Sequence, residues 1–359
     1  MRLILLLTLC FMKVESLDQL LISAFNIKVF GQSKISKPEV VDVIIKVLSR
    51  YDLVIVQEIR DIQETSFPTL VEQLNEGGIN YTWFTGPRVG RTSSKEQYGF
   101  VYRPDKLELL GKFQYNDTDD VFEREPIITR FRWLGGGGRE FTLIPMHAKP
   151  TDAVAEMNGL LQVYMDAVGV YGNNTIILGD LNADCSYVCQ SCWDSVVLRT
   201  DPTFHWLIGD DVDTTVSNTD CAYDRIIVTG DLINDVCCAD VHRFDLGLNL
   251  TTDETAMVSD HYPVEVTIVA LQPNIQQTQS NEHSTSMMSS YTAQGVTTIA
   301  INTTSVQTRT AQATSSTTSH PTPATLETRG NNSNKVFYSR FLFYCFTIMP
   351  IVSIIWNIP

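Results

Sequence analysis

Short apolar runs that end at a polar residue recur between residues 20 and 271 of this 359-residue chain. Runs of about four to eight apolar residues are typical of strands that are buried on both faces of a sheet. The polar residues that end or follow such runs include Asn26, Glu58, His147, Asp180 and Asn182. Open α/β sheets bind ligands at the ends of their strands. We therefore expect these polar side chains to converge on one site.

Helical patterns separate several of the apolar runs. Pro38 suits the first turn of a helix, and apolar residues then recur at helical spacing up to Leu48. Two further helices are predicted over residues 67–74 and 154–168. The glycines at 135–138 predict a hairpin turn rather than a phosphate loop, because no helix start follows them. Strands that alternate with helices predict an α/β fold.

The two ends of the chain are predicted to lie outside the folded domain. Met1-Arg2, the apolar run that follows and Val14-Glu15-Ser16 predict a signal peptide over residues 1–16, with a buried N-terminal helix as the alternative. Residues 273–334 are rich in Ser and Thr and contain almost no large apolar residue. Such a segment cannot bury enough surface to offset the entropy of ordering, so it predicts an extended, O-glycosylated stalk.

Residues 335–359 end in an apolar run of about the length of a membrane span. A cluster of small polar residues, Gly330-Asn331-Asn332-Ser333, lies shortly before this run. The layout predicts a glycosylphosphatidylinositol (GPI) attachment signal. A retained transmembrane helix and a merely hydrophobic tail are the alternatives. The predicted folded domain is therefore residues 17–272, which is a plausible length for one α/β domain.

Six cysteines fall within the predicted domain, and they are Cys185, Cys189, Cys192, Cys221, Cys237 and Cys238. An even number of cysteines in an exported chain predicts disulfides. The spacing of Cys189 and Cys192 also fits a redox dithiol, but no thioredoxin-like context surrounds it. Structural bridging is therefore favoured, and the pairing stays open.

The formal net charge of −15 means that the protein as a whole repels polyanions. Composition alone therefore argues against a nucleic-acid ligand, unless local basic residues or bound cations attract it. Arg88, Arg91 and Lys95 gather in the loop of residues 86–95. This loop is either a solvated hairpin or a clamp for a phosphate backbone.

Five of the polar residues offer hard oxygen ligands, and these are Asn26, Glu58, Asp180, Asn182 and Asp260. No cysteine or histidine ligand is needed among them. Such ligand sets suit Mg²⁺ or Mn²⁺, which typically act on phosphates and keep some of their bound water. The sequence therefore predicts a divalent-metal site that handles a phosphate.

Two histidines remain as proton-transfer groups. His147 and His261 have Glu96 and Asp224 available to orient them. A carboxylate behind an imidazole fixes the tautomer and stabilises the imidazolium. Two such pairs beside a divalent metal predict a phosphodiester hydrolase, in which one pair generates the attacking hydroxide and the other protonates the leaving oxygen.

Several longer motifs follow one another from about residue 20 to residue 270. They are Ser23-Ala-Phe-Asn-Ile27, Val56-Gln-Glu-Ile-Arg60, Lys95-Glu96, Arg124-Glu-Pro126, Asp152-Ala-Val-Ala-Glu156, Gly179-Asp-Leu-Asn-Ala-Asp-Cys-Ser186, Cys221-Ala-Tyr-Asp-Arg225 and Ser259-Asp-His-Tyr-Pro263. Together they resemble the deoxyribonuclease I family. The resemblance implies a four-layer α/β sandwich of two central mixed β-sheets flanked by helices. It also implies a secreted endonuclease that uses Mg²⁺ with Ca²⁺ and cuts double-stranded DNA to 5′-phosphate ends.

The resemblance also implies roles for individual residues. The catalytic pairs are His147 with Glu96 and His261 with Asp224. The metal and phosphate ligands are the five oxygen donors given above. Contacts to the DNA backbone are expected from Lys28, Arg60, Arg91, Arg124 and Tyr223. A conserved bridge joins Cys185 to Cys221, and a structural calcium site consists of Asp213, Thr215, Ser217 and Thr219.

The chain departs from the family pattern at several places. Thr92 and Ser94 stand where the family has Asn and an aromatic residue, so stacking on a sugar or base is lost. Lys28 replaces a usual Arg, which keeps the charge but gives up bidentate geometry. The acidic turn of residues 116–120 is shortened and lacks cysteines. It either holds a second calcium ion or is simply exposed.

Two other functions stay open on sequence alone. A phosphodiesterase of lipid or inositol phosphates would share the superfamily fold, but the motif from Cys221 to Arg225 and the basic loop argue against it. A DNA- or actin-binding surface module with decayed catalysis is the third alternative, and the intact histidines and acids argue against it. We expect a monomer at the extracellular face of the cell membrane, held by its C-terminal anchor or secreted.

Overall fold

The computed structural model describes residues 18–270, which lie within the predicted folded domain. The predicted signal peptide, stalk and C-terminal anchor lie outside the described residues. Within residues 18–270, no helix is long and apolar enough to cross a membrane.

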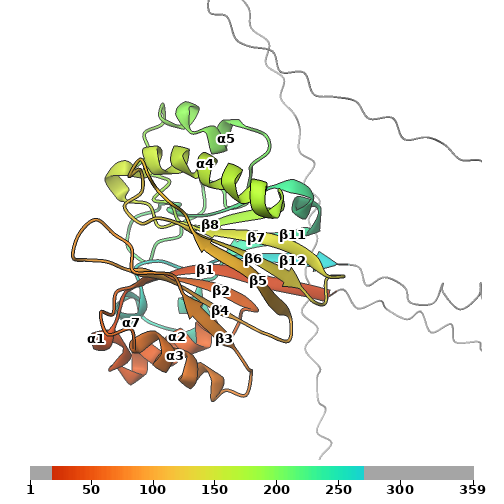
Figure 1. Ribbon diagram of the computed structural model, residues 1–359. Coiled ribbons are helices and arrows are strands. Elements are labelled where there is room, and N and C mark those ends of the chain that lie inside the picture. Colours follow the sequence, from red (N-terminus) through yellow and green to blue (C-terminus); the bar gives the residue numbers. More distant parts are fainter. Residues whose placement is uncertain (1–17, 271–359) are drawn as a thin grey trace, which may run out of the picture. The chain divides into compact units, whose positions relative to one another are not determined.

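Two six-stranded sheets pack face to face, and helices cover both outer faces (Figure 1). The first sheet has the order β11-β12-β1-β2-β4-β3 and the second the order β5-β6-β7-β8-β10-β9. Each sheet contains parallel and antiparallel pairs. This arrangement confirms the predicted four-layer α/β sandwich of two mixed sheets.

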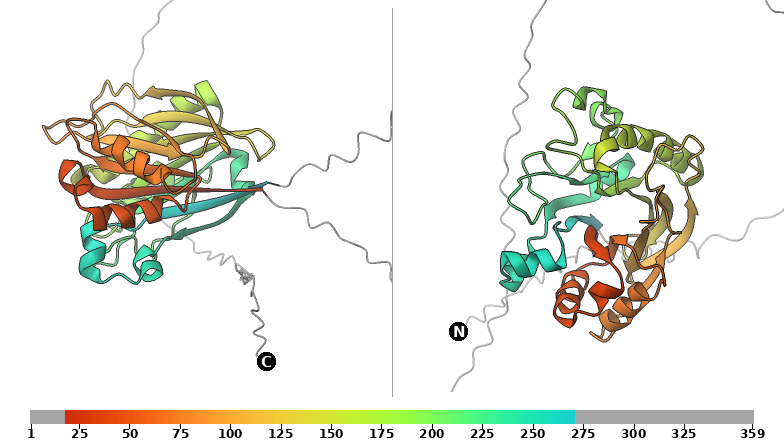
Figure 2. Two further views of the ribbon diagram at one scale, coloured as in Figure 1. Left: turned by 90° about the horizontal axis from the view of Figure 1, so that it is seen from below. Right: turned by 90° about the vertical axis from the view of Figure 1, so that its left-hand side faces the viewer.

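The first sheet combines strands from both ends of the described chain. Its members are β1 (Asp18–Phe30), β2 (Leu53–Ile59), β3 (Thr82–Thr85), β4 (Gln97–Tyr102), β11 (Val236–Val241) and β12 (Val264–Ala270). The first and last of these strands, β1 and β12, lie side by side and antiparallel (Figure 2).

The second sheet is built from the middle of the chain. Its members are β5 (Leu107–Gln114), β6 (Ile127–Trp133), β7 (Arg139–Pro145), β8 (Thr175–Asp180), β9 (His205–Trp206) and β10 (Asp224–Val228). The glycine run at 135–138 lies in the β6–β7 hairpin, as predicted.

Helices form the two outer layers. The first sheet is covered by α1 (Gln32–Ile35), α2 (Pro38–Leu48), α3 (Ser66–Asn75), α6 (Phe244–Leu248) and α7 (Thr252–Val258). The second is covered by α4 (Ala153–Tyr171) and α5 (Val197–Thr200), which lie at the top of Figure 1. The chain also forms three short 3₁₀ helices within the described residues, η1 (Pro150–Asp152), η2 (Trp193–Ser195) and η3 (Gly230–Asp235). The predicted helices at 38–48, 67–74 and 154–168 correspond to α2, α3 and α4.

The core has two parts because successive strand residues point to opposite faces of a sheet. Ile176 and Leu178 of β8 belong to the larger cluster, which fills the space between the two sheets and extends to the outer face of the first sheet under α2 and α3. Ile177 belongs to a second cluster under α4 and α5. β8 is buried along its whole length, which explains its continuous apolar sequence.

Each sheet has one parallel pair that is connected by a crossover helix. β1 and β2 are parallel and are linked through α2, while β7 and β8 are parallel and are linked through α4. Residues at or just beyond the carboxyl ends of parallel strands meet at one edge of their sheet. The two sheets therefore bring Asn26 and Glu58 toward His147 and Asp180.

Gly179 permits the close approach of the two sheets beside this edge. Its φ angle is +133°, which L side chains rarely adopt. A Cβ at this position would clash with the carbonyl oxygen of Met146 and lie 2.7 Å from Nε2 of Gln57. Only glycine fits without moving the backbone.

We predict that Gly179→Ala destabilises the protein by about 3 kcal/mol or more, because backbone strain adds to overpacking. The measurement is the unfolding free energy of the full-length protein in urea. The matched control is Gly169→Ala in α4, where an added Cβ meets no atom within 4 Å. This control should be neutral or stabilising by up to about 1 kcal/mol. Equal stabilities of the two variants would contradict the prediction.

Candidate active site

Asp180 lies at the centre of the converging polar side chains. Its Oδ2 atom is 3.6 Å from Nε2 of His147 and 3.6 Å from Nε2 of His261. The Asp180 residue is only 2% exposed. Two histidines that are far apart in sequence therefore each point their Nε2 atom at the same carboxylate oxygen.

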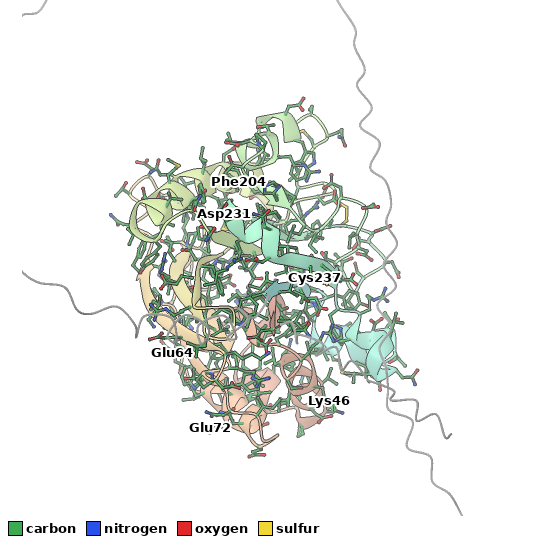
Figure 3. The ribbon with its side chains drawn as sticks, turned by 90° about the vertical axis from the view of Figure 1, so that its right-hand side faces the viewer. Lys46, Glu64, Glu72, Phe204, Asp231 and Cys237 are labelled. Atoms are coloured by element: carbon green, nitrogen blue, oxygen red, sulfur yellow. A yellow bond between two sulfur atoms is a disulfide. The ribbon has the colours of Figure 1, made fainter. Side chains whose placement is uncertain are left out.

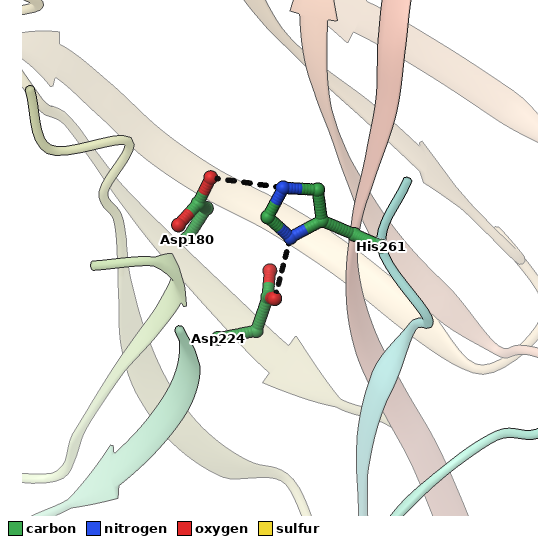
Figure 4. Close-up of side chains that lie close together, drawn as sticks. All are labelled: Asp180, Asp224 and His261. Carbon is green, nitrogen blue, oxygen red and sulfur yellow. Dashed lines mark hydrogen bonds and ion pairs between the residues drawn. The ribbon is translucent and has the colours of Figure 1, made fainter. Parts of the chain in front are cut away.

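The first histidine pair is formed by His261 and Asp224 (Figure 4). Nδ1 of His261 lies 2.7 Å from Oδ2 of Asp224, which also accepts a hydrogen bond from Thr214. The β8–β10 register places Asp224 directly opposite Asp180. Burial lowers the pKa of His261, but the Asp224 and Asp180 carboxylates outweigh it and raise that pKa to about 10.

The second histidine pair is formed by His147 and Glu96. Nδ1 of His147 lies 2.6 Å from Oε1 of Glu96, and both residues are buried. The same carboxylate forms an ion pair with Arg124. Burial lowers the pKa of His147, but the Glu96 carboxylate outweighs it, so the pKa lies above its ordinary value. Each histidine thus has one nitrogen bound to an acid and the other facing the centre.

Asn26 joins the acids of the two sheets. Its Nδ2 atom donates to Oε1 of Glu58 and to Oδ2 of Asp180, each at 3.2 Å. Glu58 has a φ angle of +62°, and Lys28 and Val29 also have positive φ angles. Such left-handed conformations are uncommon outside glycine and cluster at functional sites. They interrupt the β1–β2 ladder between Asn26 and Phe30.

The chemistry of these donors fits a divalent cation. Two carboxylates that share one hydrogen-bond donor concentrate negative charge, and hard oxygen ligands suit Mg²⁺ or Mn²⁺. A second close group contains Asp180, Asp224 and His261, whose ligand atoms lie within 4.8 Å of one another. Because Asp224 already holds His261 and Thr214, Glu58 and Asp180 are the better metal ligands.

Asn182 and Asp260 lie close to this centre but have other partners. The Asn182 side chain donates to the carbonyl of Ala148, and its main-chain N–H donates to Oδ1 of Asp180. Asp260 is more exposed and forms an ion pair with Lys28 at 3.1 Å. Its Oδ1 is 3.9 Å from Nε2 of His261. Both residues therefore border the centre, and their role as metal ligands stays a prediction.

Comparison with known proteins places this geometry in a family. Residues 24–261 match the model of the Endonuclease/Exonuclease/phosphatase family. Deoxyribonuclease-1 of Equus caballus is 44% identical over 260 residues, which cover 69% of this chain and 92% of that protein. Deoxyribonuclease-1 of Homo sapiens is 43% identical over 255 residues, which cover 68% of this chain and 90% of that protein.

The chain belongs to the deoxyribonuclease I group of the endonuclease/exonuclease/phosphatase family. This membership confirms the predicted family and class of enzyme. A family protein of Leptotrichia buccalis has a TM-score of 0.52 at 14% identity and covers 69% of this chain and 99% of that chain. At that identity it supports the fold alone.

Three of the predicted DNA-contacting cations of this deoxyribonuclease I-like chain lie at the edge of the site. Lys28 pairs with Asp260, Arg60 lies 4.0 Å from Glu58, and Arg124 pairs with Glu96. Each cation is thus within reach of an acid of the site. Their local positive charge offsets part of the negative charge of the protein.

Arg91 and Tyr223 lie in different surroundings. The guanidinium of Arg91 is bound to Asp120 in the acidic turn, with Nε 3.0 Å from Oδ1. In the structure the basic loop is therefore tied to the acidic turn. Tyr223 packs on Tyr187 with ring centroids 5.1 Å apart and lies 6.4 Å from the ring of His261.

Two disulfides answer part of the cysteine pairing that the sequence left open. Cys185 is bonded to Cys221, as the family resemblance implied, and Cys189 is bonded to Cys192. The second bridge agrees with the favoured structural role of that motif. Cys237 and Cys238 are exposed on β11, and Figure 3 labels Cys237.

The predicted calcium residues Asp213, Thr215, Ser217 and Thr219 form one cluster. Thr215 donates to Oδ1 of Asp213 through its main chain and side chain, and it contacts Thr219. Asp213, Thr215 and Ser217 line a polar cavity of about 210 Å³. The carboxylate and hydroxyl oxygens of these residues are compatible with a hard cation, while Arg243 also lines the cavity and brings a positive charge to it.

Several supporting residues were not identified as part of the site from the sequence. Gln57 donates to the carbonyl of Met146 at 2.6 Å and accepts from the N–H of Asp180 at 3.1 Å. The Tyr98 hydroxyl accepts from the N–H of His147, and Ser259 donates to the carbonyl of Asn26. Gln57 and Ser259 lie inside family motifs, but their partners come from other elements.

Glu156 of α4 supports the loops beside the second histidine pair. It is fully buried, and its Oε1 accepts from the N–H groups of Glu123 and Lys149. These residues adjoin Arg124 and follow His147 in the chain. Burial raises the pKa of Glu156 from 4.5 to about 7.

Glu156 should make stability depend on pH. The folded state keeps a proton that the unfolded chain releases between about pH 4.5 and about pH 7. The unfolding free energy therefore falls as the pH rises through this window.

We predict that Glu156→Gln removes this decline and is more stable than wild type at pH 8 by about 1 to 3 kcal/mol. Urea unfolding at pH 5 and 8 measures the difference. Glu72→Gln, an exposed change on α3 (Figure 3), is the control. A variant of Glu156 with the wild-type pH dependence would refute the assignment.

Proposed function

We propose that this protein is an extracellular, divalent-metal-dependent endonuclease that hydrolyses phosphodiester bonds of double-stranded DNA to 5′-phosphate ends. The observation that carries the proposal is the pair of histidine–carboxylate contacts that face one oxygen of Asp180. Proteins named deoxyribonuclease-1, at 41 to 44% identity, support DNA as the substrate. The proposal covers the metal requirement and the product ends as well.

The two histidines act as the proton-transfer groups. Because Nδ1 of each imidazole is bound to a carboxylate, Nε2 is the atom that exchanges a proton with substrate or water. One pair takes a proton from the attacking water, and the other gives a proton to the leaving sugar oxygen. The carboxylates behind them stabilise the imidazolium forms.

Glu58 and Asp180 are the residues that would hold a divalent cation, with Asn26 and Asn182 beside them. The bound cation would supply positive charge at the oxygens of the scissile phosphate. Asn26 orients both carboxylates toward one another through its amide group. Asn182 anchors the other oxygen of Asp180 through its main chain.

Local cations offset the unfavourable charge of the whole protein. Arg60 and Arg124 lie beside Glu58 and Glu96, so they are the residues best placed to meet the phosphate backbone. Tyr223 offers an aromatic face close to His261. Asp213 and its hydroxyl neighbours are proposed to bind a structural Ca²⁺ that holds the segment before Asp224.

Plasmid nicking by the full-length protein tests the mechanism. We predict that His261→Ala lowers the nicking rate in Mg²⁺ and Ca²⁺ by about 10² to 10⁴. The matched control is His205→Ala, which removes an exposed histidine on β9 and should leave the rate unchanged. Equal nicking by His261→Ala and wild type would exclude the proposed mechanism. A folded wild type that does not nick DNA would exclude the endonuclease.

We also propose that the protein is a monomer of the secretory pathway that a GPI anchor holds at the cell surface. The two disulfides support an oxidising compartment. The apolar run at the end of the sequence supports the anchor.

Treatment of expressing cells with a phosphatidylinositol-specific phospholipase tests the anchor. We predict release of the protein into the medium, because cleavage leaves no hydrophobic segment on the protein. Surface biotinylation before and after treatment measures the release. Retention on the cells would favour a transmembrane helix instead.

A further inference from the structure

We propose that Lys34 is a positioning residue that sets the metal-binding geometry of Asn26 and Glu58 and joins it to the segment of His261. The inference rests on the proposed function only in taking the Glu58–Asp180 centre as a metal site. Lys34 lies in α1, outside every motif that points to the site. It touches neither histidine and neither metal-binding carboxylate through a hydrogen bond.

The ammonium of Lys34 has three hydrogen-bond acceptors. Nζ donates to the carbonyl of Ile27 at 2.7 Å, to the carbonyl of Lys28, and to the carbonyl of Val258 at 2.9 Å. An ammonium has three donors, so all of them are used. Val258 ends α7, where unpaired helix carbonyls favour a cation. Lys34 therefore ties the end of α7 to the end of β1.

The two β1 carbonyls belong to an interrupted part of the ladder. Lys28 and Val29 have φ angles of +46° and +51°, and the pairing of β1 with β2 breaks between Asn26 and Phe30. Interruptions of this kind re-aim side chains near active sites. Ile27 is buried and Lys28 is exposed, so the carbonyl of Ile27 in particular needs a donor, because an unmet buried acceptor costs stability. Lys34 supplies the donors for this turn.

The N–H groups of the same turn hold the metal-binding side chains. The N–H of Lys28 donates to Oδ1 of Asn26 at 3.0 Å, and the N–H of Val29 donates to Oε2 of Glu58 at 2.8 Å. Moving the turn would therefore rotate the Asn26 amide and the Glu58 carboxylate together. Groups that orient metal ligands commonly change metal affinity by about 10- to 100-fold when they are removed.

The third contact of Lys34 extends this control to His261. Val258 is followed by Ser259, whose hydroxyl donates to the carbonyl of Asn26 at 2.6 Å and accepts from the N–H of His261 at 3.1 Å. The Lys34 ammonium thus binds the chain next to both partners of the Asn26–Ser259 hydrogen bond, at Ile27 and Lys28 on one side and at Val258 on the other. It holds the metal side and the proton-transfer side of the centre at a constant separation.

A role of Lys34 through its charge and a role through its hydrogen bonds predict opposite changes in metal affinity when the side chain is replaced. A cation beside acids repels a second cation, so loss of its charge alone should tighten metal binding. Loss of positioning should weaken metal binding instead. Lys34→Met removes the charge and the donors, whereas Lys34→Arg keeps the charge but cannot bring three N–H groups to three carbonyls from one nitrogen.

The experiment measures Mn²⁺ binding to the full-length protein by electron paramagnetic resonance, with Ca²⁺ in excess. The relevant site is the one that Asp180→Asn abolishes. We expect the Kd for Mn²⁺ to rise about 10- to 100-fold in Lys34→Met and by a smaller factor in Lys34→Arg. Lys46→Met is the matched control, because this exposed lysine of α2 pairs with Asp42 on the same helix (Figure 3). It should bind Mn²⁺ as wild type does.

Several outcomes would overturn the inference. They are tighter Mn²⁺ binding in Lys34→Met, an unchanged Kd in folded Lys34 variants with only a lower Tm, and the absence of an Asp180-dependent Mn²⁺ site in wild type. If Lys34→Met does not fold, an unchanged Kd in Lys34→Arg would overturn it as well. A wild type that binds Mn²⁺ but does not nick plasmid DNA would contradict the proposed endonuclease. In that case, weaker Mn²⁺ binding in both Lys34 variants would still support the positioning role.

Discussion

The amide of Gln57 is the contact on which the centre depends, because it crosses from one sheet to the other. It extends from β2, donates to the carbonyl of Met146 beyond β7 and accepts from the N–H of Asp180 at the end of β8. Gln57 is completely buried. A buried amide is costly unless its polar atoms are paired, so this arrangement specifies one separation of the two sheets. Gly179 beside Asp180 leaves the room that this approach requires.

The burial of so many ionisable groups explains why they occur in pairs. Glu96, Asp180, Asp224 and His147 are each no more than 5% exposed. A buried charge is tolerated when it is paired and hydrogen-bonded, and removal of one partner leaves the other uncompensated. Each histidine therefore has its own carboxylate, while Asp180 faces both. Glu58 and Asn182 beside these groups have left-handed backbone conformations, which also cost conformational energy.

The sequence predicted most of the fold because local patterns agreed with the tertiary structure. The helical periodicity that begins at Pro38 and the apolar run before Asp180 correspond to α2 and β8. The boundaries were less accurate. Glu58 was predicted to end its strand, but β2 continues for one more residue to Ile59. The polar residues Gln57 and Glu58 broke the apolar pattern, and the pairing of β2 with both of its neighbours shifts register at the same place.

The sequence by itself determined which residues could carry the chemistry, because acids, amides and histidines stood at the ends of apolar runs and in family motifs. Only the tertiary structure decided which of these residues contact one another. The register of β8 against β10 sets Asp224 opposite Asp180, and Arg91 is bound to Asp120. The contacts of Lys34 with Ile27, Lys28 and Val258 also come from the fold alone. The physical reason is that every residue has a main-chain carbonyl, so the residue type does not show which carbonyl accepts a hydrogen bond. The course of the chain in space therefore sets the partners of Gln57 and Lys34.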